Sequence, residues 1–282
     1  MNFSNYYVEP VKRYWNVPET FFSDEYNLVR AVTHKSYHIG MHAHAFYELN
    51  IVLAGAGVHH MENGSVSVKK GDVFVVPPDS YHGYERQGSG LDVFHLIFKK
   101  EFLKIYFKDL EKIAGFSFMF DAEPHLRQQR EGKYYLHLND AELADMMRDI
   151  NLLLEADEKK LFVYQNIIAL KYVCDLCIIS NRKQKKKAEE LNGKDIVMLI
   201  QYIQNNLSEK ITVKDIAAKA NMSHSTVTRF FRKTTGLSPM QYVIFLRKQR
   251  ASSLINETDL RKSEIAQICG FYDLSHMEKA LK

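Results

Sequence analysis

Residues 211–239 read ITVKDIAAKANMSHSTVTRFFRKTTGLSP, and this stretch determines the fold of the last third of the chain. Thr212 can cap a first helix, with Asp215 at the reciprocal position of a capping box. The apolar pattern breaks before Ser223, which is a second N-cap, and the helix that follows ends at Gly236. Two short helices separated by a break of about three or four residues predict a helix-turn-helix unit.

The same unit recurs later in the chain. Residues 265–269 (IAQIC) repeat the pattern of residues 216–220 (IAAKA), and Gly270 follows as the turn. Between the units, residues 239–255 predict one continuous helix that has Ser238 as its cap. At about 1.5 Å per residue this helix spans roughly 25 Å, so we expect a rigid strut. Two units fixed in this way can present reading helices to successive major-groove segments roughly 34 Å apart.

Charge is divided unevenly along the chain, whose total net charge is +4. The net charge is −5 over residues 1–180, +3 over residues 181–193 and +6 over residues 194–282. The acidic front and the basic back predict that only the last third approaches a polyanion such as DNA. Residues 181–194 are a basic linker, which either contacts DNA phosphates or is merely solvated.

The composition favours a folded intracellular protein. The chain has 282 residues, enough for two domains, and apolar residues make up 46% of it and charged residues 26%. No apolar run approaches the roughly 18 residues that a membrane-spanning helix requires, and residues 1–15 lack the apolar core of a signal peptide. Three cysteines do not make a disulfide framework, so a reducing cytoplasm is expected.

The first half is predicted to be β-structure followed by two longer helices. Glycine and proline punctuate short apolar runs between residues 26 and 99, with a hairpin turn at residues 62–64, and this spacing predicts a sandwich or small barrel. Asn139 or Asp140 can cap a helix with one apolar stripe, and residues 161–179 form a helix that is apolar over most of its circumference. Such a helix needs cover from the sheet, from its neighbour or from a second copy of the chain.

Four polar residues in the first half form a candidate binding site. His42, His44 and Glu48 are expected on one strand, where positions i, i+2 and i+6 share a face, and His82 follows later. Three imidazoles and a carboxylate can bind zinc, iron, nickel or manganese, can hydrogen-bond a polyhydroxylated ligand, or can form a structural cluster. No partner is assigned to six other histidines, which are His34, His38, His60, His95, His125 and His137.

Two sets of residues resemble known families. In the last third, the following positions occur together at fixed spacings: Ile216, Ala217, Ala220, Val227, Arg229, Phe231, Gly236, Pro239, Tyr242, Arg250, Ala251, Leu254, Ala266, Gly270, Phe271 and Ser275. This pattern, over residues 195–282, resembles the AraC/XylS family of bacterial transcription regulators. The histidine-rich residues 34–98 are similar to the two motifs of the cupin fold, although Ser36 and Asp79 replace glycine and Arg86 replaces asparagine.

The resemblance implies an α+β chain with four parts. Residues 1–138 are expected to form a cupin-like β-barrel that binds an effector, and residues 139–180 a helical pair for dimerisation. A basic linker at 181–194 then leads to an all-α double helix-turn-helix domain at 195–282. The implied function is a cytoplasmic, homodimeric transcription regulator that senses a small metabolite, by resemblance a sugar, and contacts RNA polymerase if it is an activator. The alternative is a metal-dependent cupin enzyme fused to a DNA-binding tail.

The resemblance also implies roles for individual residues. In this family the outer helix of each helix-turn-helix reads DNA, which assigns DNA contacts to Ser225, Thr228, Arg229, Arg232, Ser275 and Lys279. The regulator context favours an effector pocket without metal over a metal centre or a structural cluster. The predicted ligand-binding residues are therefore His42, His44, Glu48 and His82, and neither a cofactor nor a catalytic residue is predicted.

The second helix-turn-helix stops early in this sequence. Lys282, the last residue, has the position that Arg232 has in the first unit. The family pattern continues beyond this point with the end of the reading helix and a helix packed behind it. We therefore expect the natural chain to be longer at its C-terminus.

Overall fold

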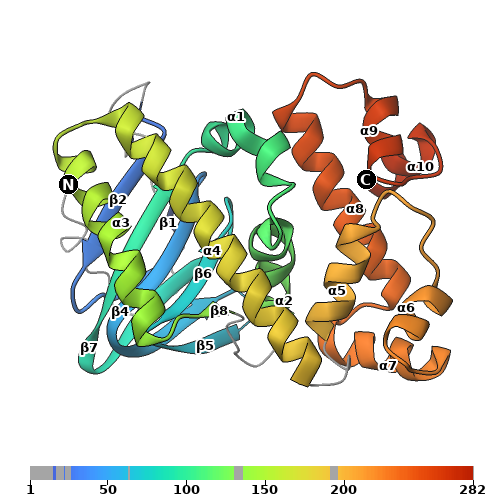
Figure 1. Ribbon diagram of the computed structural model, residues 1–282, viewed down its shortest axis with the longest axis horizontal. Coiled ribbons are helices and arrows are strands. Elements are labelled where there is room, and N and C mark those ends of the chain that lie inside the picture. The colour runs from blue at the N-terminus through green and yellow to red at the C-terminus, as the bar shows by residue number, and fades with distance from the viewer. Residues whose placement is uncertain are drawn as a thin grey trace. The chain divides into compact units, whose positions relative to one another are not determined.

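The computed structural model describes residues 15–16, 22, 27–62, 64–129, 136–190 and 196–281. It divides into two compact units. Unit 1 comprises Met1–Tyr106 and Glu123–Cys177, and unit 2 comprises Phe107–Ala122 and Ile178–Lys282. The α+β class predicted from the sequence is confirmed, with a mostly antiparallel sheet in unit 1 and helices in unit 2 (Figure 1). The sequence placed residues 107–122 with the barrel, whereas here they belong to the helical unit.

Unit 1 is built on an eight-stranded sheet in the order β1-β3-β7-β4-β6-β8, with β2 also paired to β7 and β5 to β4. The strands are β1 (Trp15–Asn16), β2 (Val29–His34), β3 (Ile39–Ala43), β4 (Tyr47–Met61), β5 (Gly64–Lys69), β6 (Asp72–Val76), β7 (His82–Phe98) and β8 (Leu136–His137). Pairing of Met61 with Gly64 confirms the predicted hairpin, whose middle residue Asn63 lies outside the described residues.

The two longest strands, β4 and β7, change partners half-way and thereby curl the sheet. Residues 48–51 of β4 pair with β6, whereas residues 56–61 pair with β5. The change falls at Gly55, where the β4–β7 register also shifts. Gly55 has φ +76°, and a Cβ there would lie 1.9 Å from the carbonyl oxygen of Gly90, so only glycine fits this bend. The bend encloses a core that contains Val52, Phe74 and Val93.

The helices that follow the sheet are α1 (Lys100–Leu110), the π-helix η3 (Phe118–Ala122), α2 (Glu123–Gln129), α3 (Asp140–Glu158) and α4 (Phe162–Glu190). Asn139, one of the two caps that the sequence allows, caps α3 in a complete capping box with Glu142. In unit 1, Tyr172 of α4 packs edge-on against Phe94 of β7, with ring centroids 6.0 Å apart. The sheet therefore covers one face of α4, whereas Val163 and Ile167 remain exposed.

Helix α4 is longer than expected from the sequence. It continues from Ile179 to Glu190, so most of the predicted linker is helical. Residues 180–190 are mostly arginine, lysine, glutamine, alanine and glutamate, which favour helix, and contain no glycine or proline.

The sequence also predicted that no segment could cross a membrane, and the structure corrects this. By length and composition alone, Phe162–Lys186 is long and apolar enough to cross one, with mean hydropathy 1.5. One such helix, partly buried here, is weak support for a membrane span.

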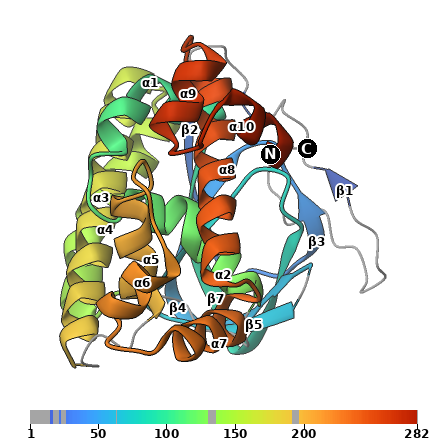
Figure 2. The same ribbon diagram turned by 90° about the vertical axis from the view of Figure 1, so that its right-hand side faces the viewer.

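Unit 2 contains the two predicted helix-turn-helix units. Its helices are α5 (Ile196–Asn205), α6 (Val213–Lys219), α7 (His224–Thr235), α8 (Pro239–Glu257), α9 (Lys262–Ile268) and α10 (Leu274–Leu281). The predicted caps Thr212, Ser223 and Ser238 all accept hydrogen bonds from backbone N–H groups of their helices. The α6–α7 and α9–α10 pairs lie at opposite ends of α8 (Figures 1 and 2), which confirms the predicted strut.

A buried arginine joins the strut to the first unit. Nε of Arg247 on α8 donates to the carbonyl oxygen of Leu207 at 3.1 Å, and Nη2 donates to that of Glu209 at 2.7 Å. Gly270, in the turn of the second unit, packs against the same Leu207 carbonyl with φ +76°. This junction holds the two helix-turn-helix units in a defined relation within unit 2.

Candidate functional site

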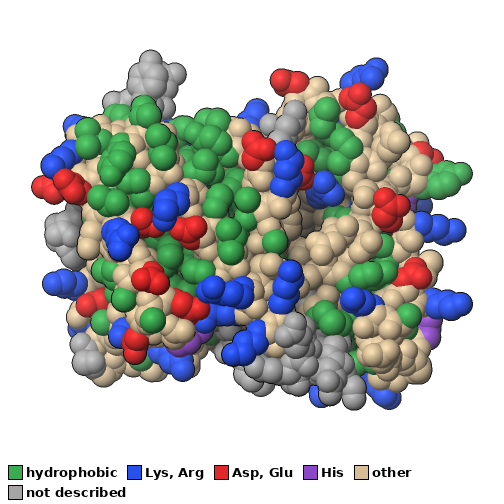
Figure 3. Space-filling model, in the orientation of Figure 1, with side chains coloured by type: hydrophobic (Ala, Val, Ile, Leu, Met, Phe, Trp, Pro, Cys, Tyr) green, Lys and Arg blue, Asp and Glu red, His purple; other side chains and the backbone are tan. Residues whose placement is uncertain are grey.

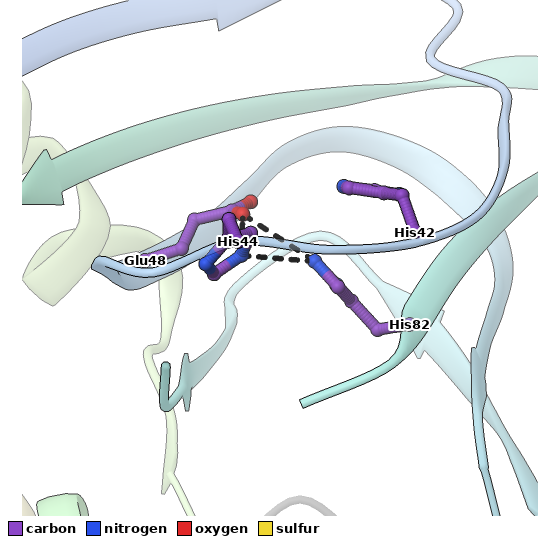
Figure 4. A group of neighbouring side chains, drawn as sticks. All are labelled: His42, His44, Glu48 and His82. Atoms are coloured by element: carbon purple, nitrogen blue, oxygen red, sulfur yellow. Dashed lines mark hydrogen bonds and ion pairs between the residues drawn. The ribbon is translucent and has the colours of Figure 1, made fainter. Parts of the chain in front are cut away.

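The four predicted ligand-binding residues meet inside unit 1 (Figure 4). One nitrogen or oxygen atom of each lies within 4.8 Å of those of the others, and all four side chains are buried. We call His42, His44, Glu48 and His82 the histidine cluster. Nε2 of His44 lies 3.0 Å from Oε2 of Glu48 and 3.1 Å from Nε2 of His82. His82 in turn lies 3.6 Å from the same carboxylate oxygen.

The structure corrects how these residues are brought together. The sequence placed His42, His44 and Glu48 on one strand, but β3 ends at Ala43 and β4 begins at Tyr47. His44 lies in the connection, and Glu48, the second residue of β4, points at the histidines. His82 is added because the first residue of β7 pairs with His42 of β3.

His95, to which the sequence assigned no partner, belongs to the surroundings of the cluster. Its Nδ1 donates to Oε1 of Glu48 at 2.5 Å, and its side chain is buried. His59 is also buried, and its Nε2 lies 3.4 Å from Nδ1 of His82. No local pattern connects His95 to Glu48, because the contact depends on the register between β4 and β7.

Burial and mutual charge set the protonation of the cluster. Burial lowers the pKa of His42 to about 4, and burial followed by repulsion from His42 holds the pKa of His82 well below its usual value. Burial alone would raise the pKa of Glu48, but His95, His82 and a hydrogen bond from His44 together hold that pKa well below its usual value. At neutral pH, His42 and His82 are therefore neutral and Glu48 is a carboxylate.

This donor set fits a divalent transition metal ion, which the cupin-like fold also implies. Unprotonated imidazole nitrogen and carboxylate oxygen are common ligands of zinc, nickel and iron. The four residues that would hold the ion are those of the histidine cluster, and the ion would supply a Lewis-acidic positive charge there. The same atoms could instead offer hydrogen bonds to a hydroxylated ligand.

The six residues assigned to DNA lie on the outer helices of unit 2. Ser225, Arg229 and Arg232 on α7, and Ser275 and Lys279 on α10, are exposed, while Thr228 is half-buried and donates to the carbonyl oxygen of His224 at 2.8 Å. Among the described residues, Arg229, Arg232 and Lys279 form no ion pair with a carboxylate.

The opposite faces of the two outer helices are buried. Val227 and Phe231 of α7 and Met277 of α10 are 0% exposed. Each helix is thus anchored by its apolar face and presents its polar face outward. This arrangement leaves the cationic face of α7 and the polar face of α10 exposed to solvent.

Unit 2 also contains a polar cavity of about 540 Å³ that the sequence did not predict. Its lining includes Asp121, Gln204 and the ion pair between Arg250 and Glu111, whose atoms are 2.9 Å apart. Burial raises the pKa of Asp121 to about 7, against the attraction of Arg250. These residues come from distant parts of the sequence, so no local signal could have identified the cavity.

Two family models match the chain. The model of the AraC-like ligand binding domain matches residues 28–164, and the model of a helix-turn-helix domain matches residues 216–282. The chain belongs to the AraC/XylS family of transcription regulators. This AraC/XylS regulator is a DNA-binding protein with an N-terminal ligand-binding domain, as the sequence predicts.

Curated relatives agree with this family. The HTH-type transcriptional activator RhaS of Enterobacter sp. (strain 638) is 23% identical over 239 residues, which cover 83% of this chain and 80% of that protein. RhaS of Pectobacterium carotovorum subsp. carotovorum (strain PC1) is 25% identical over 240 residues with the same coverage. The similarity to these proteins thus extends over both units of the AraC/XylS regulator.

Solved structures give weaker similarities. The DNA-binding domain of AdpA in complex with a target DNA is 31% identical and covers 29% of this chain and 75% of that chain, with a TM-score of 0.29. Wild-type ToxT from Vibrio cholerae strain SCE256, with an unsaturated fatty acid bound, is 14% identical over 90% of each chain, with a TM-score of 0.35. At such TM-scores the family assignment depends on the family models.

Proposed function

We propose that this AraC/XylS regulator reads an operator through α7 and α10 and that an effector bound in unit 1 changes its action on transcription. The observation that carries the DNA-binding role is the exposed face of α7, which presents Arg229, Arg232 and Lys233, together with the exposed polar face of α10 at the other end of the strut. The DNA contacts proposed are those of Ser225, Thr228, Arg229, Arg232, Ser275 and Lys279.

Replacing Arg229 with alanine and replacing Arg232 with alanine should weaken DNA binding in different ways. Arg229, on the exposed face of α7, is assigned to a base, so Arg229→Ala should cost about 1–3 kcal/mol on the operator and relax discrimination at one base pair. Arg232 is assigned to phosphate, so Arg232→Ala should weaken binding to all sequences alike and lower the salt slope by about one unit.

Fluorescence anisotropy with a selected operator and with random DNA, over a range of salt concentrations, measures both effects. Each variant serves as the matched control of the other, because both side chains are exposed arginines on one helix. If Arg229→Ala loses equal affinity for the two DNAs, Arg229 does not read a base. If neither variant weakens binding, α7 is not the reading helix.

The effector proposed is a small hydroxylated metabolite of the carbohydrate class, bound in unit 1 at or beside the histidine cluster. Imidazole and carboxylate groups supply both hydrogen-bond donors and acceptors, which suit hydroxyl groups. The two RhaS relatives are named transcriptional activators, which supports activation with RNA polymerase as partner. The proposed site of action is the cytoplasm, and no catalytic step is required of any residue.

A second copy of the chain is the proposed partner of α4. Val163 and Ile167, one turn apart on this helix, are 75% and 60% exposed, and apolar side chains follow the helix in Figure 3. Replacing both with glutamate should convert a dimer to a monomer in sedimentation experiments, since two charges would enter an apolar interface. Asn151→Glu, at an exposed polar position on α3, is the control and should leave the dimer intact. A wild-type monomer at micromolar concentration would contradict this proposal.

A further inference from the structure

The polar cavity of unit 2 contains an acidic side chain that has no bonded partner. Four of the five residues of η3, Phe118, Met119, Phe120 and Ala122, are buried and anchor this turn. The fifth, Asp121, is half-buried and lines the cavity of about 540 Å³. Its carboxyl group forms no hydrogen bond or ion pair with another described residue. The cavity therefore offers a carboxylate to a ligand.

The positive charge of Arg250, in the same lining, is already engaged. Arg250 attracts Asp121, but its Nη2 donates to Oε2 of Glu111 at 2.9 Å. Burial outweighs the attraction and raises the pKa of Asp121 to about 7. A further cation beside Asp121 would favour the ionised carboxylate and would itself be stabilised by it. The site thus favours a ligand that carries an ammonium group.

An unpaired cation lies in the same lining. The side chain of Lys185, at an exposed position on α4, forms no ion pair or hydrogen bond within the described part of the chain. Lys112, which also lines the cavity, is by contrast bonded to Asp109 at 2.9 Å. Lys185 is therefore available to an acidic group of a ligand. A molecule with an ammonium group toward Asp121 and a carboxylate toward Lys185 would match both charges.

The rest of the lining suits a small organic molecule rather than a bare ion. Phe107, Ile113 and Leu246 supply apolar surface, and Ser208 and Ser253 supply hydroxyl groups. Apolar walls with a few polar groups are typical of small-molecule sites, whose volumes are roughly 300–1,000 Å³. The cavity lies within this range, and Figure 3 shows the surface hollowed beside α8.

The cavity is bounded by two functionally important segments. Leu246, Arg250 and Ser253 line it from α8, where their spacing of i, i+4 and i+7 puts them on one face of the strut. The second segment is residues 107–121, which the chain enters from Tyr106 and leaves toward Glu123, both in unit 1. A ligand in the cavity would therefore contact the strut of both helix-turn-helix units and the segment that continues into the ligand-binding domain.

We propose that this cavity is a second ligand site, which binds a small zwitterion of the amino-acid class. Asp121 binds the ammonium group, Lys185 binds the carboxylate, and the apolar walls accept the side chain. The cavity lies wholly in unit 2 and is separate from the effector site proposed at the histidine cluster of unit 1. Neither the operator nor that effector is needed for this binding.

Binding of free amino acids to the full chain tests the site. The twenty common amino acids are screened by thermal shift at millimolar concentration, and the one with the largest shift is measured by isothermal titration calorimetry. It is compared with the amine that lacks its carboxylate and with the acid that lacks its ammonium group. We expect the amino acid to bind at least about 10-fold more tightly than either, because each analogue loses one charged contact.

Two variants that remove a charge assign the contacts. Asp121→Asn keeps the shape of the neutral carboxyl group and should lower affinity at least about 10-fold for the amino acid and the amine, but not for the acid. Lys185→Gln should instead lower affinity for the amino acid and the acid. Asp259→Asn and Lys186→Gln are the matched controls, because both residues are exposed and lie outside the cavity lining. Both should bind the amino acid as the wild type does.

The pH dependence of binding identifies Asp121 independently. Because the ammonium group binds the carboxylate form, affinity for the amino acid should rise between about pH 6 and pH 8, as Asp121 ionises with a pKa of about 7. The other charged side chains of the lining are Glu111, Lys112, Lys185 and Arg250. All four are retained in Asp121→Asn, so loss of the pH dependence in that variant assigns it to Asp121.

Three outcomes would overturn the proposal. Absence of a thermal shift or calorimetric signal with every amino acid would reject the amino-acid class. Equal affinity for the amino acid and its amine would show that the carboxylate and Lys185 contribute nothing. Binding that is unchanged in both Asp121→Asn and Lys185→Gln would place the ligand elsewhere in the regulator.

Discussion

Gly270→Ala should destabilise unit 2 strongly and weaken operator binding with it. Gly270 has φ +76°, a conformation that costs a residue with a Cβ about 1–2 kcal/mol. The added Cβ would also lie 2.2 Å from the carbonyl oxygen of Leu207 and 2.8 Å from Nη2 of Arg247. Overpacking of this kind adds about 1–3 kcal/mol. Since the clash lies where the strut meets the first unit, α10 should also be displaced from its reading position.

Urea unfolding and operator anisotropy measure the two consequences of Gly270→Ala. Gly88→Ala is a suitable control, because Gly88 also has a positive φ of +56° but no atom within 4 Å of the added Cβ. It should lose only the backbone term of about 1–2 kcal/mol and leave operator affinity unchanged. Equal losses of stability in the two variants would show that the contact with Leu207 and Arg247 contributes nothing.

His42→Ala and His82→Ala should each abolish the response to the effector while DNA binding itself is retained. The two histidines belong to unit 1 and the reading helices to unit 2, so loss of the cluster should leave the DNA-binding fold intact. An effector typically changes affinity at a second site about 5- to 150-fold, and this change is the quantity that should disappear.

Pentoses and hexoses are first screened by thermal shift on the wild-type protein, and a sugar that raises the melting temperature is used in the operator assay. His60→Ala, outside the cluster, should respond as the wild type does. If both cluster variants still respond at wild-type sugar concentrations, the effector binds elsewhere in the regulator. If no sugar shifts the melting temperature, the carbohydrate class is wrong, whereas the DNA-binding assignment is unaffected.

The features that were predicted correctly in unit 2 depend on contacts between near neighbours in sequence. Thr212 bonds Asp215 three residues later, and Ser223 and Ser238 cap their helices over the same spacing. Four or five consecutive residues are therefore enough to predict where a helix starts. The spacing of apolar residues at the helical period predicts which face is buried. For this reason the helix-turn-helix units and the strut between them follow from the sequence alone.

The residues of the histidine cluster were also identified from the sequence, but their geometry was not. The expectation of one strand through His42, His44 and Glu48 was wrong, since the chain turns between β3 and β4. The orientation of Glu48 depends on His95, which only the register of β4 with β7 brings near it. Strand register is a property of the whole sheet, so the residues next to Glu48 or His95 in the sequence do not predict this contact.

The sequence by itself determined the family, the two helix-turn-helix units and the candidate ligands, because these follow from local caps, periodicity and residue type. Only the tertiary structure decided that residues 107–122 belong to the helical unit, that Arg247 and Gly270 meet at Leu207, and that the four side chains of the histidine cluster come within 4.8 Å of one another. Each of these depends on residues far apart in the chain, whose approach is set by packing and strand pairing rather than by their neighbours.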